Sequence, residues 1–185
     1  MSAGKIFISD QSNIYLLKFV GDVRLTLSAS LSHYLDTLFE NSHVEQVIVD
    51  MLEAEGADST TLGLIAKLGL HCRKHYSINA QLFCQNPSIL RTLECMGFDE
   101  IIDIFSQSPE INGKLRTFNA LREASRETSR EASEEVLEET SDTKIDKLRE
   151  QVLESHKVLR QLNPENSVEF SDLIKALESD LSQSH

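Results

Sequence analysis

An alternation of short apolar runs and longer helical patterns between residues 5 and 105 constrains the fold more than any other feature. Runs rich in Val, Ile, Leu and Phe predict strands, and leucines three or four residues apart predict amphipathic helices. The predicted strands are residues 6–8, 14–20, 47–51, 80–84 and 101–105. The predicted helices are residues 27–40, 59–75 and 87–97.

The order strand, helix, strand favours parallel pairing with right-handed crossovers. Residues 47–51 and 80–84, joined by the helix over 59–75, form one such unit. The first two strands are separated by a short break, so we expect them to pair antiparallel, and we expect Gly21 and Asp22 to end the second strand. The pattern therefore predicts an α/β fold: a mixed sheet of four to five strands covered by helices, plus a C-terminal α-helical extension.

The chain divides into three parts. Residues 1–105 form the α/β domain. Residues 106–142 are expected to be a linker and a solvated helix, because the repeat REAS, RETS, REAS (122–133) is polar and has few large apolar residues. Residues 143–185 predict an amphipathic helical hairpin that turns at Asn163-Pro164. Its apolar positions are Ile145, Leu148, Val152, Leu159 and Leu162, then Phe170, Leu173, Leu177 and Leu181.

Two interpretations of this hairpin stay open. Its apolar face could pack on the α/β domain and cover an apolar edge, because an amphipathic helix needs a surface. Alternatively, the hairpin could dock a second regulator.

The charge balance excludes some classes of partner. The formal net charge is −12 and the pI is near 4.9, which argues against binding to nucleic acid or to an anionic membrane surface. The N-terminus has no basic region followed by a long apolar stretch, and no run approaches the length of a membrane span. The spacing of Cys72, Cys84 and Cys95 favours reduced thiols over a disulfide framework. We therefore expect a soluble cytoplasmic protein.

Motifs for catalysis are missing from the sequence. It contains no Gly-rich phosphate loop and no Gly-x-Ser-x-Gly elbow, so we expect no catalytic residues, no enzyme activity and no cofactor. His71 and His75 have the spacing of some zinc ligands, but they lie in the predicted last turn of a helix, where such side chains complement the helix dipole. Four carboxylates favour a solvated edge over a metal site: Asp50, Glu53, Glu55 and Asp58.

The stretch GADSTTLG (56–63) comes between a buried strand and a predicted helix. Asp58 or Ser59 is expected to cap that helix by accepting hydrogen bonds from its first N–H groups. The carboxyl end of a parallel strand is also where open α/β sheets bind ligands, and a helix N-terminus stabilises negative charge. Ser59 is therefore either an ordinary helix start or a hydroxyl that tolerates a phosphoryl group.

The longer stretch VIVDMLEAEGADSTTLGLIAKL (47–68) resembles the signature of anti-sigma factor antagonists, the STAS domain family. In that signature, a strand reading V-V-D leads to Asp-Ser-Ser/Thr-Gly-Leu-Gly at the start of a helix. The likeness extends over residues 5–105 through Gly21-Asp22, N-P-S (86–88) and MGFDEIIDIF (96–105). The resemblance implies a STAS-like fold.

The resemblance also implies a phosphorylation-controlled binding module. In this family, the serine that matches Ser59 is phosphorylated by a partner anti-sigma factor with a serine kinase domain, and a serine phosphatase reverses the reaction. Unmodified, the module binds the anti-sigma factor and frees a sigma factor. The residues expected to contact the partner are Asp58, Ser59, Thr60, Thr61 and Leu62, with Asp22, Val23, Arg24, Leu25 and Thr26.

Two positions depart from the family pattern. Thr61 stands where the family usually has Gly, and Arg24 stands where an acid often follows Asp22 by two residues. The Asp-Ser-Thr-Thr-Leu-Gly variant and the acidic tail resemble the longer, HsbA-type antagonists that act in switching between motility and biofilm growth. The alternative is a STAS scaffold or accessory subunit of a larger regulatory or transport complex, without sigma-factor control.

Overall fold

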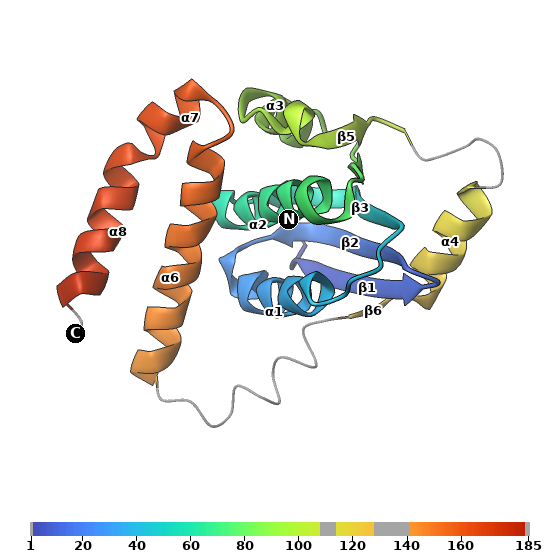
Figure 1. Ribbon diagram of the computed structural model, residues 1–185, viewed down its shortest axis with the longest axis horizontal. Helices are drawn as coiled ribbons and strands as arrows, with labels where there is room; N and C mark the ends of the chain where they lie inside the picture. The colour runs from blue at the N-terminus through green and yellow to red at the C-terminus, as the bar shows by residue number, and fades with distance from the viewer. Residues whose placement is uncertain (1, 108–113, 128–140, 184–185) are drawn as a thin grey trace.

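The computed structural model describes residues 2–107, 114–127 and 141–183 and has an α/β fold (Figure 1). The strands are β1 (Lys5–Gln11), β2 (Ile14–Val23), β3 (Gln46–Ala57), β4 (Ala80–Phe83), β5 (Ile102–Phe105) and β6 (Arg126–Glu127). They form one sheet in the order β5-β4-β3-β2-β1-β6. β1 pairs antiparallel with β2 and with β6, and the pairs from β2 to β5 are parallel. The mixed sheet of five strands is confirmed, and the two-residue β6 extends it.

The second and third strands are longer than the apolar runs indicate. β2 continues through Gly21 and Asp22 to Val23, so the expected break at these residues is wrong. Gly21 has a φ of +71°, and the β2–β3 register shifts on either side of it. β3 pairs with β2 as far as Ala57, so backbone hydrogen bonds hold its polar last third extended.

Three helices pack on one face of the sheet: α1 (Ser28–Phe39), α2 (Ser59–His71) and α3 (Pro87–Cys95). Asn86 caps α3, and Pro87 occupies its first turn, where the missing N–H has no cost. α2 ends at His71, four residues before the predicted end of this helix at residue 75. Cys72–Tyr76 form a π-helical turn instead. The main core combines these helices with alternate residues of the strands, among them Leu17, Phe19, Val47, Val49, Leu62, Ile65 and Leu93.

α4 (Lys114–Ala124) lies on the opposite face of the sheet. Its Leu121 is fully buried against Leu16, Ile48 and Phe83. Arg122 forms an ion pair with Asp50 at 2.7 Å and also reaches the carboxylate of Glu53. The expectation of a solvated helix is therefore wrong at the end of α4, because one Leu and one Arg attach it to the sheet. The rest of the repeat, after residue 127, lies outside the described residues, and the predicted domain boundaries stay predictions.

The C-terminal helices are α6 (Ser141–Arg160), α7 (Pro164–Glu169) and α8 (Ser171–Gln183), which turn at Asn163. We call residues 141–183 the hairpin. α6 lies along α2, and the figure shows α8 running back beside α6 (Figure 1). Four hairpin residues join the main core: Leu153, Leu159, Phe170 and Ile174. In this structure the hairpin thus packs on the α/β part of the chain, as the first interpretation expected. Over the described ranges, no helix is long and apolar enough to cross a bilayer.

Candidate functional site

Asp58 connects the two segments that the sequence singled out. It is in an extended conformation directly before α2, and its Oδ1 accepts a hydrogen bond from the N–H of Thr61 at 2.9 Å. Its Oδ2 accepts a second hydrogen bond from the N–H of Leu25 at 2.6 Å. The prediction of a helix cap is confirmed, with Asp58 in that role. The same carboxylate holds residues 22–26 beside the start of α2.

These two segments form what we call the Ser59 surface, residues 22–26 and 58–62. Four of its residues are buried: Val23, Thr60, Thr61 and Leu62. Arg24 and Thr26 are exposed, and Asp22, Leu25, Asp58 and Ser59 are partly exposed. In this conformation the buried residues cannot touch a partner. Thr61, which replaces the family's Gly, fits because its N–H is capped and its side chain lies inside.

Arg24, the other departure from the family pattern, folds back on its neighbour. Its Nε donates to Asp22 Oδ2 at 2.5 Å. This hydrogen bond, together with the charge of Asp22, raises the pKa of the Arg24 guanidinium. The pair is exposed on the Arg24 side, where the side chain has 58% exposure, so it contributes little to stability. Arg24 neutralises Asp22 and leaves the Ser59 surface less acidic.

The Ser59 hydroxyl has a partner that the sequence reasoning missed. Ser59 Oγ lies 2.9 Å from Nε2 of His156 on α6, and His156 is only 3% exposed. Nδ1 of His156 lies 2.7 Å from the carbonyl oxygen of Val152, which can only accept. In the neutral ring, Nδ1 therefore carries the proton and Nε2 accepts the hydrogen bond from Ser59. A signal was present: Ser155 and His156 interrupt the apolar face of α6 between Val152 and Leu159.

α2 and α6 are in close contact one turn beyond Ser59. A Cβ atom added to Gly63 would lie 2.5 Å from the carbonyl oxygen of Ser155 and 2.6 Å from its Cβ. Any side chain at residue 63 would thus collide with the backbone of α6. The Gly of the Thr-Leu-Gly motif lets the two helices approach at this point.

Two further groups of hydrogen bonds attach the hairpin to helix ends. At the start of α1, Gln151 Nε2 donates to the Ser28 carbonyl oxygen at 2.9 Å, and Ser28 Oγ donates to Gln151 Oε1 at 2.8 Å. At the end of α3, Asn163 Nδ2 donates to the Cys95 carbonyl oxygen and Asn166 Nδ2 to that of Met96, both at 3.0 Å. The hairpin therefore spans the ends of all three helices on this face.

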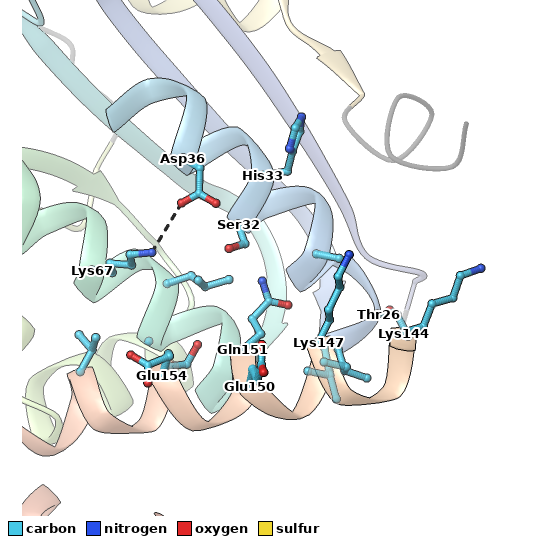
Figure 2. Close-up of a pocket in the computed structure, with 17 residues that line it drawn as sticks. Thr26, Ser32, His33, Asp36, Lys67, Lys144, Lys147, Glu150, Gln151 and Glu154 are labelled. Atoms are coloured by element: carbon cyan, nitrogen blue, oxygen red, sulfur yellow. Dashed lines mark ion pairs between the residues drawn. The ribbon is translucent and has the colours of Figure 1, made fainter. Parts of the chain in front are cut away.

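A groove of about 840 Å³ runs along α6 and is lined by residues of α1, α2 and α6 (Figure 2). Its labelled side chains have both signs of charge, including Lys144, Lys147 and Glu150 from α6. Asp36 and Lys67 form an ion pair across it at 3.7 Å. Ser59 and His156 do not line the groove.

The residues weighed as metal ligands have other contacts. His71 stacks between Phe39 and His75, with ring centroids 3.8 Å and 4.2 Å away, and burial lowers the pKa of its imidazole. Asp50 is fully buried beside Arg122, not solvated, and burial raises the pKa of its carboxyl. Glu55 accepts hydrogen bonds from Ser2. Within the described part of the chain, no group of three or more His, Cys, Asp or Glu residues is placed to hold a metal ion.

Comparison with protein families identifies residues 6–111 as a STAS domain. The chain belongs to the STAS domain family. The resemblance read from the sequence is thus confirmed at the level of the family. The match ends before α4, so α4 and the hairpin lie outside the matched STAS region, and the hairpin covers one edge of it.

Among solved structures, the STAS protein is similar to an anti-sigma factor antagonist from Mycobacterium paratuberculosis, with 13% identity over 65% of this chain and 95% of that chain and a TM-score of 0.49. It is also similar to the anti-sigma factor antagonist SpoIIAA in its unphosphorylated form, with 10% identity over 64% and 97% of the two chains and a TM-score of 0.48. Comparison with the curated proteins gives no match.

Proposed function

We propose that this STAS domain protein is an anti-sigma factor antagonist. Unphosphorylated, it binds an anti-sigma factor that has a serine kinase domain and so frees a sigma factor in the cytoplasm. Phosphorylation of Ser59 by that kinase ends the binding, and a serine phosphatase restores it. The observation that carries the proposal is the Asp58 carboxylate, which joins residues 22–26 to the start of α2 at Ser59.

The position of Ser59 suits a removable charge. It is the first residue of α2, where free backbone N–H groups and the helix dipole stabilise an anion. A phosphoryl group adds roughly −1.5 to −2 charges at neutral pH. Repulsion from an acidic partner group about 4 Å away, at an effective dielectric near 20, is of order 4 kcal/mol. That energy corresponds to a loss of roughly three orders of magnitude in affinity.

The proposal needs no catalysis by this chain. Ser59 and His156 are at the distance of a nucleophile and its base, 2.9 Å. However, His156 is 3% exposed, and neither residue lines the groove. A substrate has no path to the pair in this arrangement, so we interpret the hydrogen bond as a packing contact.

Affinity capture tests the proposal with the full-length chain and three variants: Ser59→Ala, Ser59→Asp and Ser42→Asp. Lysate comes from cells that express the protein, and mass spectrometry scores both the captured proteins and phosphate on Ser59. Wild type, Ser59→Ala and Ser42→Asp are expected to capture a serine-kinase anti-sigma factor, and Ser59→Asp to lose it. Ser42 is an exposed control in the loop before β3. Equal capture by the two Ser59 variants would refute the switch.

One observation favours a second candidate, a STAS scaffold or accessory subunit. The Ser59 hydroxyl is already engaged by His156, and four residues of the Ser59 surface are buried. A scaffold would form a stable complex that all Ser59 variants retain, and wild-type protein would have no phosphate at Ser59. The same capture experiment therefore separates the two candidates.

A further inference from the structure

We propose that the hairpin is the resident occupant of the Ser59 surface, and that an anti-sigma factor binds only after displacing it. The inference rests on the proposed function and adds how access to that site is controlled. The hairpin belongs to the same chain, so its contact is intramolecular, and a partner in solution has to compete with it.

Occupancy follows from where the hairpin binds. His156 holds the hydroxyl of Ser59, and the backbone at Ser155 fills the space over Gly63. Gln151 exchanges two hydrogen bonds with Ser28, at the start of the helix that follows residues 22–26. Together these contacts place α6 over the Ser59 surface and the helix starts next to it.

Phosphorylation cannot take place in this arrangement. The attacking oxygen of Ser59 has to approach the phosphorus atom of the donor to about 3–3.5 Å with the reacting groups aligned. An imidazole nitrogen lies 2.9 Å from that oxygen, and His156 is itself buried. The same space cannot hold both α6 and a kinase. Docking of the hairpin and modification of Ser59 therefore exclude each other.

The hairpin is an addition to the STAS fold. The family match ends at residue 111, so the matched domain does not include the hairpin. An open groove of about 840 Å³ also runs along α6, lined by residues of α1, α2 and α6, so part of the α6 face is left uncovered.

A partner-free experiment measures whether the hairpin covers residue 59. In a full-length Cys95→Ser background, Ser59→Cys supplies a thiol, because Cys72 and Cys84 are buried and Cys95 is exposed. The measured quantity is the rate of reaction with a polyethylene-glycol maleimide. Adding Ser155→Arg, which collides with α2 at Gly63, is expected to raise the rate at least tenfold. Ser167→Arg, on the exposed side of α7, is the matched control and should leave the rate unchanged.

Equal rates in the Ser155→Arg and Ser167→Arg backgrounds would overturn the inference. Circular dichroism checks that Ser155→Arg keeps the STAS fold. If it does not, the double variant Gln151→Ala/Asn163→Ala replaces it, because that variant removes contacts to α1 and α3 without adding bulk.

A second measurement concerns the partner. The dissociation constant for the anti-sigma factor found by capture is expected to fall at least tenfold in full-length Ser155→Arg, relative to wild type and to Ser167→Arg. Equal constants would overturn the inference even if the maleimide reacts faster. If no variant, Ser155→Arg included, binds any anti-sigma factor, the proposed function fails. The maleimide rates need no partner, so the two failures are distinguishable.

Discussion

The chain adds helices to both faces of the STAS sheet, and different forces hold the two additions (Figure 1). Among the side chains of α4 that the structure describes, Leu121 is buried against the sheet, and Arg122 forms an ion pair with a fully buried carboxylate, Asp50. The hairpin is attached by several apolar side chains and by neutral hydrogen bonds to helix ends. Removing Arg122 leaves an uncompensated buried charge, whereas a neutral hydrogen bond can be exchanged for one to water. The comparison therefore contrasts a charged attachment at α4 with an apolar and neutral attachment at the hairpin.

Removal of Arg122 tests the charged attachment of α4 and should have the largest effect. Arg122→Ala leaves Asp50 buried without its Arg partner, and we expect the free energy of unfolding to fall by about 3 kcal/mol. Urea denaturation followed by circular dichroism measures the change. Arg149→Ala is the control, because Arg149 pairs with Asp146 on an exposed surface, and should cost less than about 0.5 kcal/mol. Similar losses in both variants would contradict the comparison.

A methyl group between α2 and α6 tests the neutral attachment of the hairpin. Gly63→Ala places a Cβ atom 2.5 Å from the Ser155 carbonyl oxygen, and we expect a loss of about 1–3 kcal/mol. Hydrogen–deuterium exchange should show lost protection in the hairpin while β1 to β5 stay protected. Gly69→Ala, in the same helix, is the matched control. Its Cβ would instead meet the side chain of Ile102 at 2.6 Å. Loss of hairpin protection in Gly69→Ala as well would mean that the hairpin unfolds with the sheet.

The pH dependence of the α4 attachment is a smaller effect. Burial raises the pKa of the Asp50 carboxyl, so the folded state holds that proton more tightly than the unfolded state. The contribution of Asp50 to the free energy of unfolding therefore falls as the pH rises from about 4 through the raised pKa. Relative to that of Asp50→Asn, the free energy of unfolding of the wild type should fall by on the order of 1 kcal/mol across this pH window.

Denaturation of both proteins at several pH values gives the difference between them. Glu53 has the opposite effect, because the hydrogen bond from Lys18 lowers the pKa of its carboxyl. Its contribution to the free energy of unfolding is therefore lost as the pH falls. Glu53 is present in both proteins and largely cancels in the difference. A difference that does not change with pH would show that Asp50 is not the titrating group.

Arg24→Ala should have the smallest effect on stability. Arg24 is exposed, and solvent screens its ion pair with Asp22, so we expect no measurable change in the melting temperature. The exposed Arg91→Ala is the control and should behave alike. If Arg24→Ala changes partner capture with so little loss of stability, Arg24 acts in recognition. A clear fall in the melting temperature would instead make it part of the fold.

Local chemistry explains what the sequence predicted. The Asp58 cap, the Asn86-Pro87 helix start and the apolar runs of the strands act over a few residues, so each can be seen in the sequence. The polar end of β3 was missed because its pairing partner, residues 20–23 of β2, holds it extended. The strand propensity of a segment does not reflect its pairing with another strand.

Long-range contacts explain what was missed at the site. The His156–Ser59 hydrogen bond joins residues 97 positions apart, and such a contact leaves no periodic pattern. Leu121 did leave one, because Leu115, Phe118 and Leu121 lie three residues apart just before the polar repeat. The burial of Val23, Thr60, Thr61 and Leu62 likewise depends on the packing of the whole fold. Ser59 as a phosphorylation site, the ten partner-contact residues and a second regulator at the hairpin stay predictions.

The orientation of the His156 ring sets an order of events. Nδ1 donates to Val152, so Nε2 offers Ser59 only a lone pair. A phosphoserine ester oxygen has no proton to give, so phosphorylation removes this hydrogen bond, and the phosphoryl group needs the space that the ring occupies 2.9 Å from Oγ. The ring therefore cannot return to the same position on a modified chain. The C-terminal helices would then return only after hydrolysis of the ester, and a phosphatase would find its target uncovered.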